Sequence, residues 1–228
     1  LLLLFGVLTD GRFLSASTLL IVFNQGLIIA TAAIGVSFIY TTGNIDISVG
    51  NILGLSAVFG ALAYNDTQNA ALMIIVSVIS GMILMFLNSM LSVLLGIKTI
   101  TVAVVMIQLY GAITNWILGP EQIRVNYSVA KGLENNGYRY VAFILYFVVC
   151  LVIYHKTVVG RRLRFIGGNE VCARQTGMNS KSAVIIGFII AGVGIGLGAT
   201  FSIIRTGTVS VSTGDGMGMN IMLATVLG

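Results

Sequence analysis

Residues Gly160–Asn179 read GRRLRFIGGNEVCARQTGMN and form a polar, cationic island in an otherwise apolar chain. The 228 residues include only 12 Lys and Arg and 7 Asp and Glu. Six of these cations fall between residues 156 and 181, against one acid, Glu170. In membrane proteins an excess of Lys and Arg marks the loops that stay in the cytoplasm. We therefore expect this segment to be a cytoplasmic loop between two membrane-spanning helices.

The composition outside this island is that of a membrane protein. Hydrophobic residues make up 57% of the chain, charged residues 8%, and the mean hydropathy is +1.03. Soluble domains have about 45–50% apolar and about 25% charged residues. A helix needs about 20 apolar residues to cross the hydrocarbon core of a bilayer. The apolar segments long enough to do so are 18–40, 45–64, 70–97, 99–119, 138–155 and 183–205.

The expected fold is all-α, a polytopic transmembrane helical bundle with some broken or re-entrant helices. We expect one transmembrane domain over residues 1–228, belonging to a longer polypeptide, with partial spans at both ends that include residues 1–8. Placing the cationic segment in the cytoplasm puts loop 120–137 outside, Lys98 inside and Asn65–Asn69 outside. This alternation predicts that the N-terminus lies in the cytoplasm.

Small residues recur at helical spacing in the last long span. The chain has 28 glycines, and four of them alternate with larger residues from Gly192 to Gly198, after the pair Gly187 and Ala191. Small residues four positions apart let helix backbones approach closely in lipid. A dinucleotide loop needs a preceding strand and a polar turn. Because this run lies inside an apolar span, it predicts helix packing.

Polar residues interrupt the chain between the first two long spans, where Gly43–Gly50 reads GNIDISVG. A carboxylate between two apolar runs is costly unless it is paired or lies at a helix end. Asp46 or Ser48 is expected to cap a helix that begins near Val49. The alternative is a polar cavity at a break in the helix, with Asn44, Asp46 and Ser48 along the transport pathway. Asp215 precedes the final apolar run and is expected to cap it in the same way.

Chemistry-bearing residues are scarce. The single histidine, His155, falls at the end of a span, which disfavours a serine hydrolase built on Ser56 because the base must reach the serine. Cys150 and Cys172 have no metal-ligand spacing and are expected to be unpaired thiols. The sequence contains no phosphate-binding GxxxxGK[ST] motif. We expect no catalytic residue, metal or cofactor, and no nucleic-acid partner, because the cations cluster in loops between apolar spans.

Two segments resemble the permease subunits of bacterial ATP-binding cassette (ABC) importers for simple sugars, of the ribose, galactose and autoinducer 2 type. Gly43–Gly50 is similar to the GGIDLSVG of that family, and Gly160–Asn179 to its GRxxYAIGGNxxAARLSGIN. Leu223–Gly228 resembles a later AAVVLG segment. The resemblance implies a non-catalytic subunit that imports a small polar solute by alternating access. It also implies as partners ATPase subunits that bind the ATP, a second permease subunit, an extracytoplasmic solute-binding protein and membrane lipid.

The resemblance further implies that residues 160–181 contain a coupling helix that docks on the ATPase. Asn169 would cap this helix, Glu170 would lie in its positive first turn and Gly177 would end it. The coupling residues carried over from the family are Gly168, Asn169, Glu170, Ala173, Arg174 and Gly177.

Two regions depart from the family pattern and leave the solute open. Ile97–Met106 lacks the usual prolines and TLG, and Gly216–Ala224 replaces a YELDxIA segment, so its Glu and Asp are missing. Nucleosides and branched-chain amino acids are alternative solutes within the wider family. An ion-coupled secondary transporter is a further alternative, in which Asp46 would be the acid that couples the ion. The final alternative for the class of protein is a passive channel.

Overall fold

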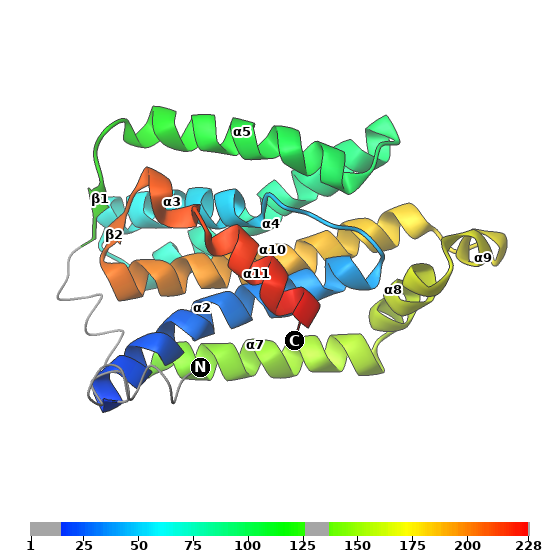
Figure 1. Ribbon diagram of the computed structural model, residues 1–228, viewed down its shortest axis with the longest axis horizontal. Coiled ribbons are helices and arrows are strands. Elements are labelled where there is room, and N and C mark those ends of the chain that lie inside the picture. Colours follow the sequence, from blue (N-terminus) through cyan, green and yellow to red (C-terminus); the bar gives the residue numbers. More distant parts are fainter. Residues whose placement is uncertain (1–14, 126–136, 228) are drawn as a thin grey trace, which may run out of the picture.

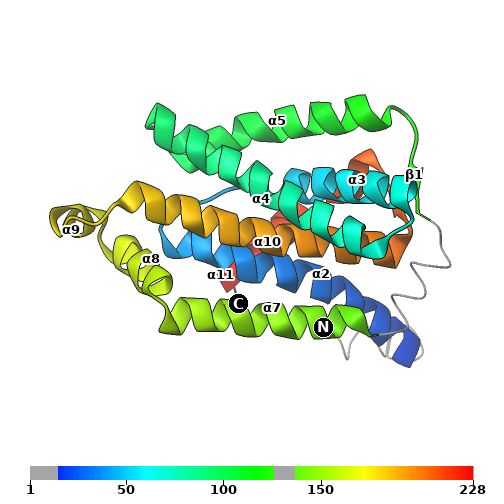
Figure 2. The same ribbon diagram turned by 180° about the vertical axis from the view of Figure 1, so that it is seen from behind.

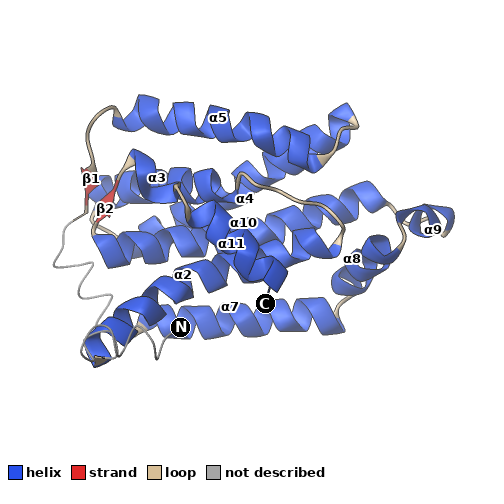
Figure 3. Ribbon diagram, viewed as in Figure 1, coloured by secondary structure: helices blue, strands red, loops and turns tan. Residues whose placement is uncertain are grey.

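The computed structural model describes residues 15–125 and 137–227. It is built almost wholly of helices, which run roughly parallel or antiparallel along the longest axis of the molecule (Figures 1 and 2). Only one pair of two-residue strands accompanies them in the described ranges (Figure 3). The elements in chain order are α2 (Ala16–Thr41), α3 (Val49–Thr67), α4 (Ala70–Leu95), α5 (Thr99–Leu118), β1 (Ile123–Arg124), α7 (Tyr138–Lys156), α8 (Val158–Gly168), α9 (Glu170–Gln175), α10 (Ser180–Thr206), β2 (Thr208–Val209), the 3₁₀-helix η2 (Val211–Gly214) and α11 (Met217–Leu227).

Five of the described helices are long and apolar enough to cross a membrane. They are α2, α4, α5, α7 and α10, and each matches one of the apolar segments that the sequence predicts. The predicted all-α polytopic bundle is thereby confirmed. The predicted segment 45–64 is partly wrong, because its helix, α3, begins only at Val49 and is less apolar than the other five. Predicted residues 1–8 lie outside the described ranges.

Polar side chains and glycines define the ends of these helices. Asn69 caps α4 by accepting a hydrogen bond from the Ala71 N–H at 2.9 Å, and Asn179 caps α10 by accepting from the Ser182 N–H at 3.1 Å. Gly96 ends α4 with φ 66° and Gly207 ends α10 with φ 63°. Glycine is favoured at both ends because a Cβ is strained at positive φ.

The glycine run of α10 lies between two neighbouring helices. A Cβ on Gly192 would come within 2.6 Å of the Met82 Cα on α4, and one on Gly194 within 2.8 Å of the Thr31 carbonyl oxygen on α2. Two residues rotate a helix by about 200°, so glycines two positions apart face opposite sides. The run therefore serves two interfaces, with Gly192 and Gly196 against α4 and Gly194 and Gly198 against α2. The predicted close helix packing is confirmed.

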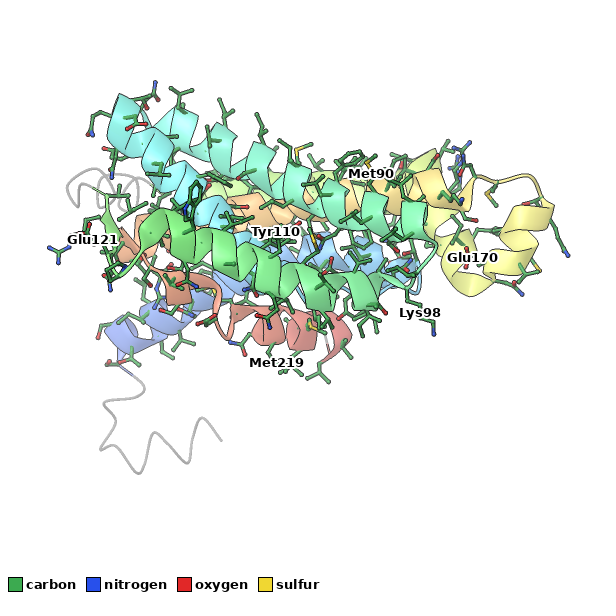
Figure 4. All side chains as sticks on the ribbon, turned by 90° about the horizontal axis from the view of Figure 1, so that it is seen from above. Met90, Lys98, Tyr110, Glu121, Glu170 and Met219 are labelled. Carbon is green, nitrogen blue, oxygen red and sulfur yellow. The ribbon has the colours of Figure 1, made fainter. Side chains whose placement is uncertain are left out.

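The two ends of the bundle differ in charge. Lys98 and Glu170 lie at one end of the molecule and Glu121 at the other (Figure 4). The first end also carries α8, which contains Arg161, Arg162 and Arg164, and α9, which projects beyond the long helices (Figure 1). This arrangement agrees with the alternation of loops that the sequence predicts. The positive-inside rule predicts that the end that carries α8 and α9 faces the cytoplasm.

The opposite end carries a strand pair that the sequence pattern does not predict. Ile123 of β1 pairs with Val209 of β2, and Arg124 with Thr208, in antiparallel register. The Asn65 side chain, near the end of α3, donates a hydrogen bond to the Arg124 carbonyl at 3.2 Å. These contacts join the segment after α5 to the segment after α10. A strand of two residues is too short to show an alternating pattern.

Candidate functional site

The first candidate site is the polar, non-helical segment between α2 and α3, residues 42–48, which we call the α2–α3 break. After α2 ends at Thr41 the chain turns at Gly43, which has φ 76°, and runs back along the bundle until α3 begins at Val49 (Figure 1). Non-helical backbone at membrane depth is tolerated only where protein or a polar cavity surrounds it. The contacts of the break satisfy this condition, because Asp46 and Ser48 are both fully buried.

The Asp46 carboxylate is held by three hydrogen-bond donors. Its Oδ1 accepts from the Ser48 N–H at 2.8 Å and from the Ser48 hydroxyl at 2.6 Å, and its Oδ2 accepts from Asn88 Nδ2 at 2.9 Å. Within the described ranges no cationic side chain contacts it. Hydrogen bonds to a charged group are about twice as strong as neutral ones, and they compensate for burial. Asp46 thus joins the α2–α3 break to α4.

The network extends from α4 to α5 through Tyr110. The Tyr110 hydroxyl donates to Asn88 Oδ1 at 2.8 Å, and Asn88 Nδ2 also donates to the Ser48 hydroxyl at 2.7 Å. All four polar side chains of this network, Asp46, Ser48, Asn88 and Tyr110, are buried. The sequence reasoning missed Asn88 and Tyr110. An amide inside a 26-residue apolar helix is the signal that marks Asn88, since such residues are rare at membrane depth.

Asn44 and Thr99 make a second link across the break. The Thr99 hydroxyl, at the start of α5, contacts Asn44 Oδ1 at 3.3 Å and donates to the Ile45 carbonyl at 3.1 Å. Asn44 in turn donates to the Thr42 hydroxyl at 2.9 Å. Asn44 is thus joined to the start of α5, whereas Asp46 and Ser48 belong to the network with Asn88 and Tyr110.

The predicted helix caps take a different form from that expected. Ser48 is the residue that precedes α3, but its side chain makes no capping hydrogen bond, because its hydroxyl is engaged with Asp46 and Asn88. Asp46 binds the Ser48 N–H rather than one inside the helix. Asp215 is exposed at the end of η2, two residues before α11, and forms no side-chain hydrogen bond to any described residue. Asp215 is therefore separate from the buried network.

The second candidate site is the α8–α9 segment. Asn169 caps α9 by accepting from the Cys172 N–H at 3.0 Å, Glu170 lies in the first turn, and Gly177 follows the helix with φ 78°. The predicted short helix, its cap and its stop are all present. Gly168 lies at the end of α8. Arg174 belongs to α9, but its side chain is not among those that the structure describes.

One residue anchors α9 to the bundle. Ala173 is fully buried, and its cluster includes Leu163 and Ile166 of α8 and Phe38 of α2. The other side of α9 is exposed: Val171 is 66% exposed, and the thiol of Cys172 is free. α9 therefore presents Val171 and Cys172 away from the bundle, where a soluble partner can reach them.

A cleft of about 580 Å³ connects the two candidate sites. One wall contains Asn44 and Ile45 of the break, and another contains Glu170 of α9. The cleft also includes Lys98, just before α5, and Lys181 at the start of α10. The α9 segment and the α2–α3 break therefore border one common cleft.

The family is shown by comparison with known proteins. The chain belongs to the family of permease components of branched-chain amino acid transport systems, whose model matches residues 18–228. It is the membrane-spanning permease subunit of an ABC importer, a multi-pass protein of the bacterial inner membrane. Importers of this class combine such a permease with an ATPase and a solute-binding protein. No solved structure matches the chain significantly.

Similar proteins are known from several bacteria. The autoinducer 2 import system permease protein LsrC of Photorhabdus luminescens is 30% identical over 238 aligned residues, which cover 100% of this chain and 71% of that protein. The protein of the same name from Shigella flexneri is 27% identical over 227 residues, covering 96% of this chain and 66% of that protein. These alignments span both candidate sites.

Proposed function

We propose that this permease carries a simple sugar or a similar small polar solute into the cytoplasm by alternating access. The similar proteins are named for import of autoinducer 2, which supports this class of solute over amino acids and nucleosides. The observation that carries the proposal is a series of packed contacts from α9 to the end of α2. Ala173 of α9 packs with Leu163 and Ile166 of α8, and Gly167 of α8 lies against the Thr41 carbonyl, directly before the α2–α3 break. These contacts support a mechanical route from the cytoplasmic end into the membrane.

In this proposal the α9 segment is the coupling element. Gly168, Asn169, Glu170, Ala173, Arg174 and Gly177 form or support the surface that an ATPase subunit grips. The cap at Asn169 and the buried Ala173 hold α9 in place, so a push on its exposed side moves α8 and α10 with it. ATP binds to and is hydrolysed by the partner, and the permease contributes movement rather than catalysis.

In this proposal the α2–α3 break is the segment that moves when α9 is displaced. Residues 44–47 lie between α2 and α3 and belong to no helix, whereas Ser48 already accepts the Ile52 N–H of α3 at 3.0 Å. The segment before Ser48 can therefore shift at lower cost than a helix. Its contacts with Asn88 and Tyr110 hold it in the arrangement seen here. A second permease subunit completes the pore, and an extracytoplasmic binding protein delivers the solute at the end that carries β1 and β2.

The test is ATP-driven uptake by the assembled transporter. The permease is reconstituted in proteoliposomes with its ATPase and binding protein, and the uptake of labelled autoinducer 2 is compared with that of ribose, adenosine and leucine. The proposal predicts ATP-dependent uptake of autoinducer 2 or ribose. Uptake confined to leucine or adenosine would overturn the proposed solute class, and uptake driven by an ion gradient without ATP would overturn the mechanism.

A further inference from the structure

We propose that a polar stripe on α5 lines the solute pathway and hydrogen-bonds the solute as it passes. The stripe consists of Thr101, Gln108 and Asn115, and we call it the α5 polar stripe. The inference rests on the proposed function and names the residues of this chain that would contact a solute rich in hydroxyl groups.

The three residues share one exposed side of a membrane-spanning helix. They are seven positions apart, which is about two turns, and all three are exposed. The opposite side of α5 is buried, with Val102, Met106 and Tyr110 facing the core. The stripe therefore runs along most of α5 (Thr99–Leu118) on its outward side.

The exposed sides of two other spans have a different composition. Every exposed residue of α4 between Ala71 and Leu95 is apolar, and so is every exposed residue of α7 between Val141 and Val152. These apolar surfaces can face the hydrocarbon chains of the bilayer. Amide side chains facing lipid lack hydrogen-bond partners and are costly there. The contrast indicates that the α5 polar stripe faces something other than lipid.

The hydrogen bonds of the stripe leave groups available to a ligand. Gln108 and Thr101 make no side-chain hydrogen bond to any described residue, and Asn115 uses only its Nδ2, which donates to the Gly111 carbonyl at 3.0 Å. An amide offers two donors and a carbonyl acceptor, the set that complements a hydroxyl group. A sugar-like solute would satisfy these groups at successive levels of the helix.

The stripe borders the start of α3, directly after the polar break. Asn51 on α3 donates from Nδ2 to the Ile107 carbonyl on α5 at 3.4 Å, and a Cβ on Gly111 would lie 3.7 Å from the same nitrogen. Gly111 is one turn from Gln108 and from Asn115 on the side of α5 that faces α3. The start of α3 therefore places one further polar side chain, Asn51, beside the α5 polar stripe.

The apolar part of the exposed side of α5 supplies matched controls. Leu109 is 47% exposed and Val105 is 64% exposed, and both are close to Gln108 in depth but turned toward the side that lacks polar residues. The test places cysteine at one position at a time, in Gln108→Cys, Asn115→Cys and Leu109→Cys. Each transporter is treated in proteoliposomes with 2-aminoethyl methanethiosulfonate, and labelling is quantified by peptide mass spectrometry. The free, exposed Cys172 is the internal reference.

We expect Gln108→Cys and Asn115→Cys to react at least about tenfold faster than Leu109→Cys, because a thiol in hydrocarbon stays protonated and unreactive. Autoinducer 2 should slow the labelling of Gln108→Cys and leave that of Cys172 unchanged. Equal, slow labelling at Gln108→Cys and Leu109→Cys would overturn the inference. The labelling rate does not depend on uptake. Fast labelling of Gln108→Cys together with no import of autoinducer 2 by the unmodified transporter would therefore contradict the solute class alone.

A second variant keeps the inference testable if the cysteine variants express poorly. Gln108→Leu suits both a helix and lipid, so a lipid-facing Gln108 predicts unchanged uptake. A pathway-facing Gln108 predicts a rise of about tenfold in the KM for autoinducer 2, the equivalent of one lost hydrogen bond. Leu109→Ala is the control, with an unchanged KM. An unchanged KM for Gln108→Leu would overturn the assignment.

Discussion

At the scale of single residues, the α2–α3 break is held by a buried carboxylate that no described cationic side chain contacts. Asp46 is fully buried and accepts three hydrogen bonds, two from Ser48 and one from Asn88. Such a group is satisfied only while all its donors are in place. If the break shifts during transport, the donors that Asp46 loses must be replaced by others. The geometry of this residue therefore sets the stability of the arrangement seen here.

Replacing Asp46 tests this network. Asp46→Leu leaves buried donors on Ser48 and Asn88 unpaired, at about 1–3 kcal/mol each, so we expect a clearly lower thermal midpoint in detergent. Asp46→Asn places an NH₂ group against the Asn88 NH₂ group and should also destabilise the protein. Adding Asn88→Asp to that variant restores one donor–acceptor pair across the same gap. A double variant no more stable than Asp46→Asn would contradict the direct contact of these two side chains.

The sequence predicted part of this site, for physical reasons. Asn44, Asp46 and Ser48 are close in the chain, so their spacing alone brings them together. Asn88 and Tyr110 lie 42 and 64 positions beyond Asp46, and only the packing of α4 and α5 against the break brings them near it. For the same reason the predicted cap at Ser48 was wrong: a tertiary partner on α4 competes for the hydroxyl.

At the scale of elements, α10 is central because its glycines serve two interfaces. The period of four residues was visible in the sequence, and it predicted close packing correctly. The assignment of alternate glycines to α4 and α2 was not visible, since periodicity shows which residues share a face but not which helix that face meets. The same limit applies to the stripe on α5, whose exposure only the fold reveals.

Enlarging a glycine of α10 should separate it from α4. In Gly196→Ile the added side chain meets the α4 backbone at Ser77 and Val78, so we expect a loss of at least about 1–3 kcal/mol and a lower thermal midpoint. Gly26→Ala on α2 is the matched control, because its Cβ has no neighbour within 4 Å and alanine favours the helix. Equal stability of the two variants would contradict the packing described for α10.

Removing the cap of α9 should weaken coupling more than it weakens the fold. Asn169→Ala removes the hydrogen bond to the Cys172 N–H, worth about 1 kcal/mol to a six-residue helix on the cytoplasmic end. We expect less stimulation of the ATPase by the loaded binding protein, with the thermal midpoint nearly unchanged. Asn169→Asp retains the cap and should retain stimulation. Full stimulation in Asn169→Ala would count against α9 as the coupling element.

At the scale of the whole molecule, charge and hydropathy were sufficient to predict most of the architecture. The spans were predictable because a bilayer requires about 20 apolar residues per helix, and their direction because cations collect on one side. The bundle accordingly carries α8 and α9 at one end and the β1–β2 pair at the other (Figure 1). The cleft between α9 and the break was not predictable, because its walls come from five separate segments.

The most direct test of the account asks which side of the membrane α9 occupies. Cys172 is exposed on α9, whereas Cys150 is buried on α7, so the unmodified protein carries one accessible thiol within its described residues. A thiol reagent that does not cross bilayers is applied to right-side-out cells and to inside-out vesicles. We predict labelling of Cys172 in the inside-out vesicles alone. Labelling from outside intact cells would place α9 away from any cytoplasmic ATPase and contradict the proposed mechanism.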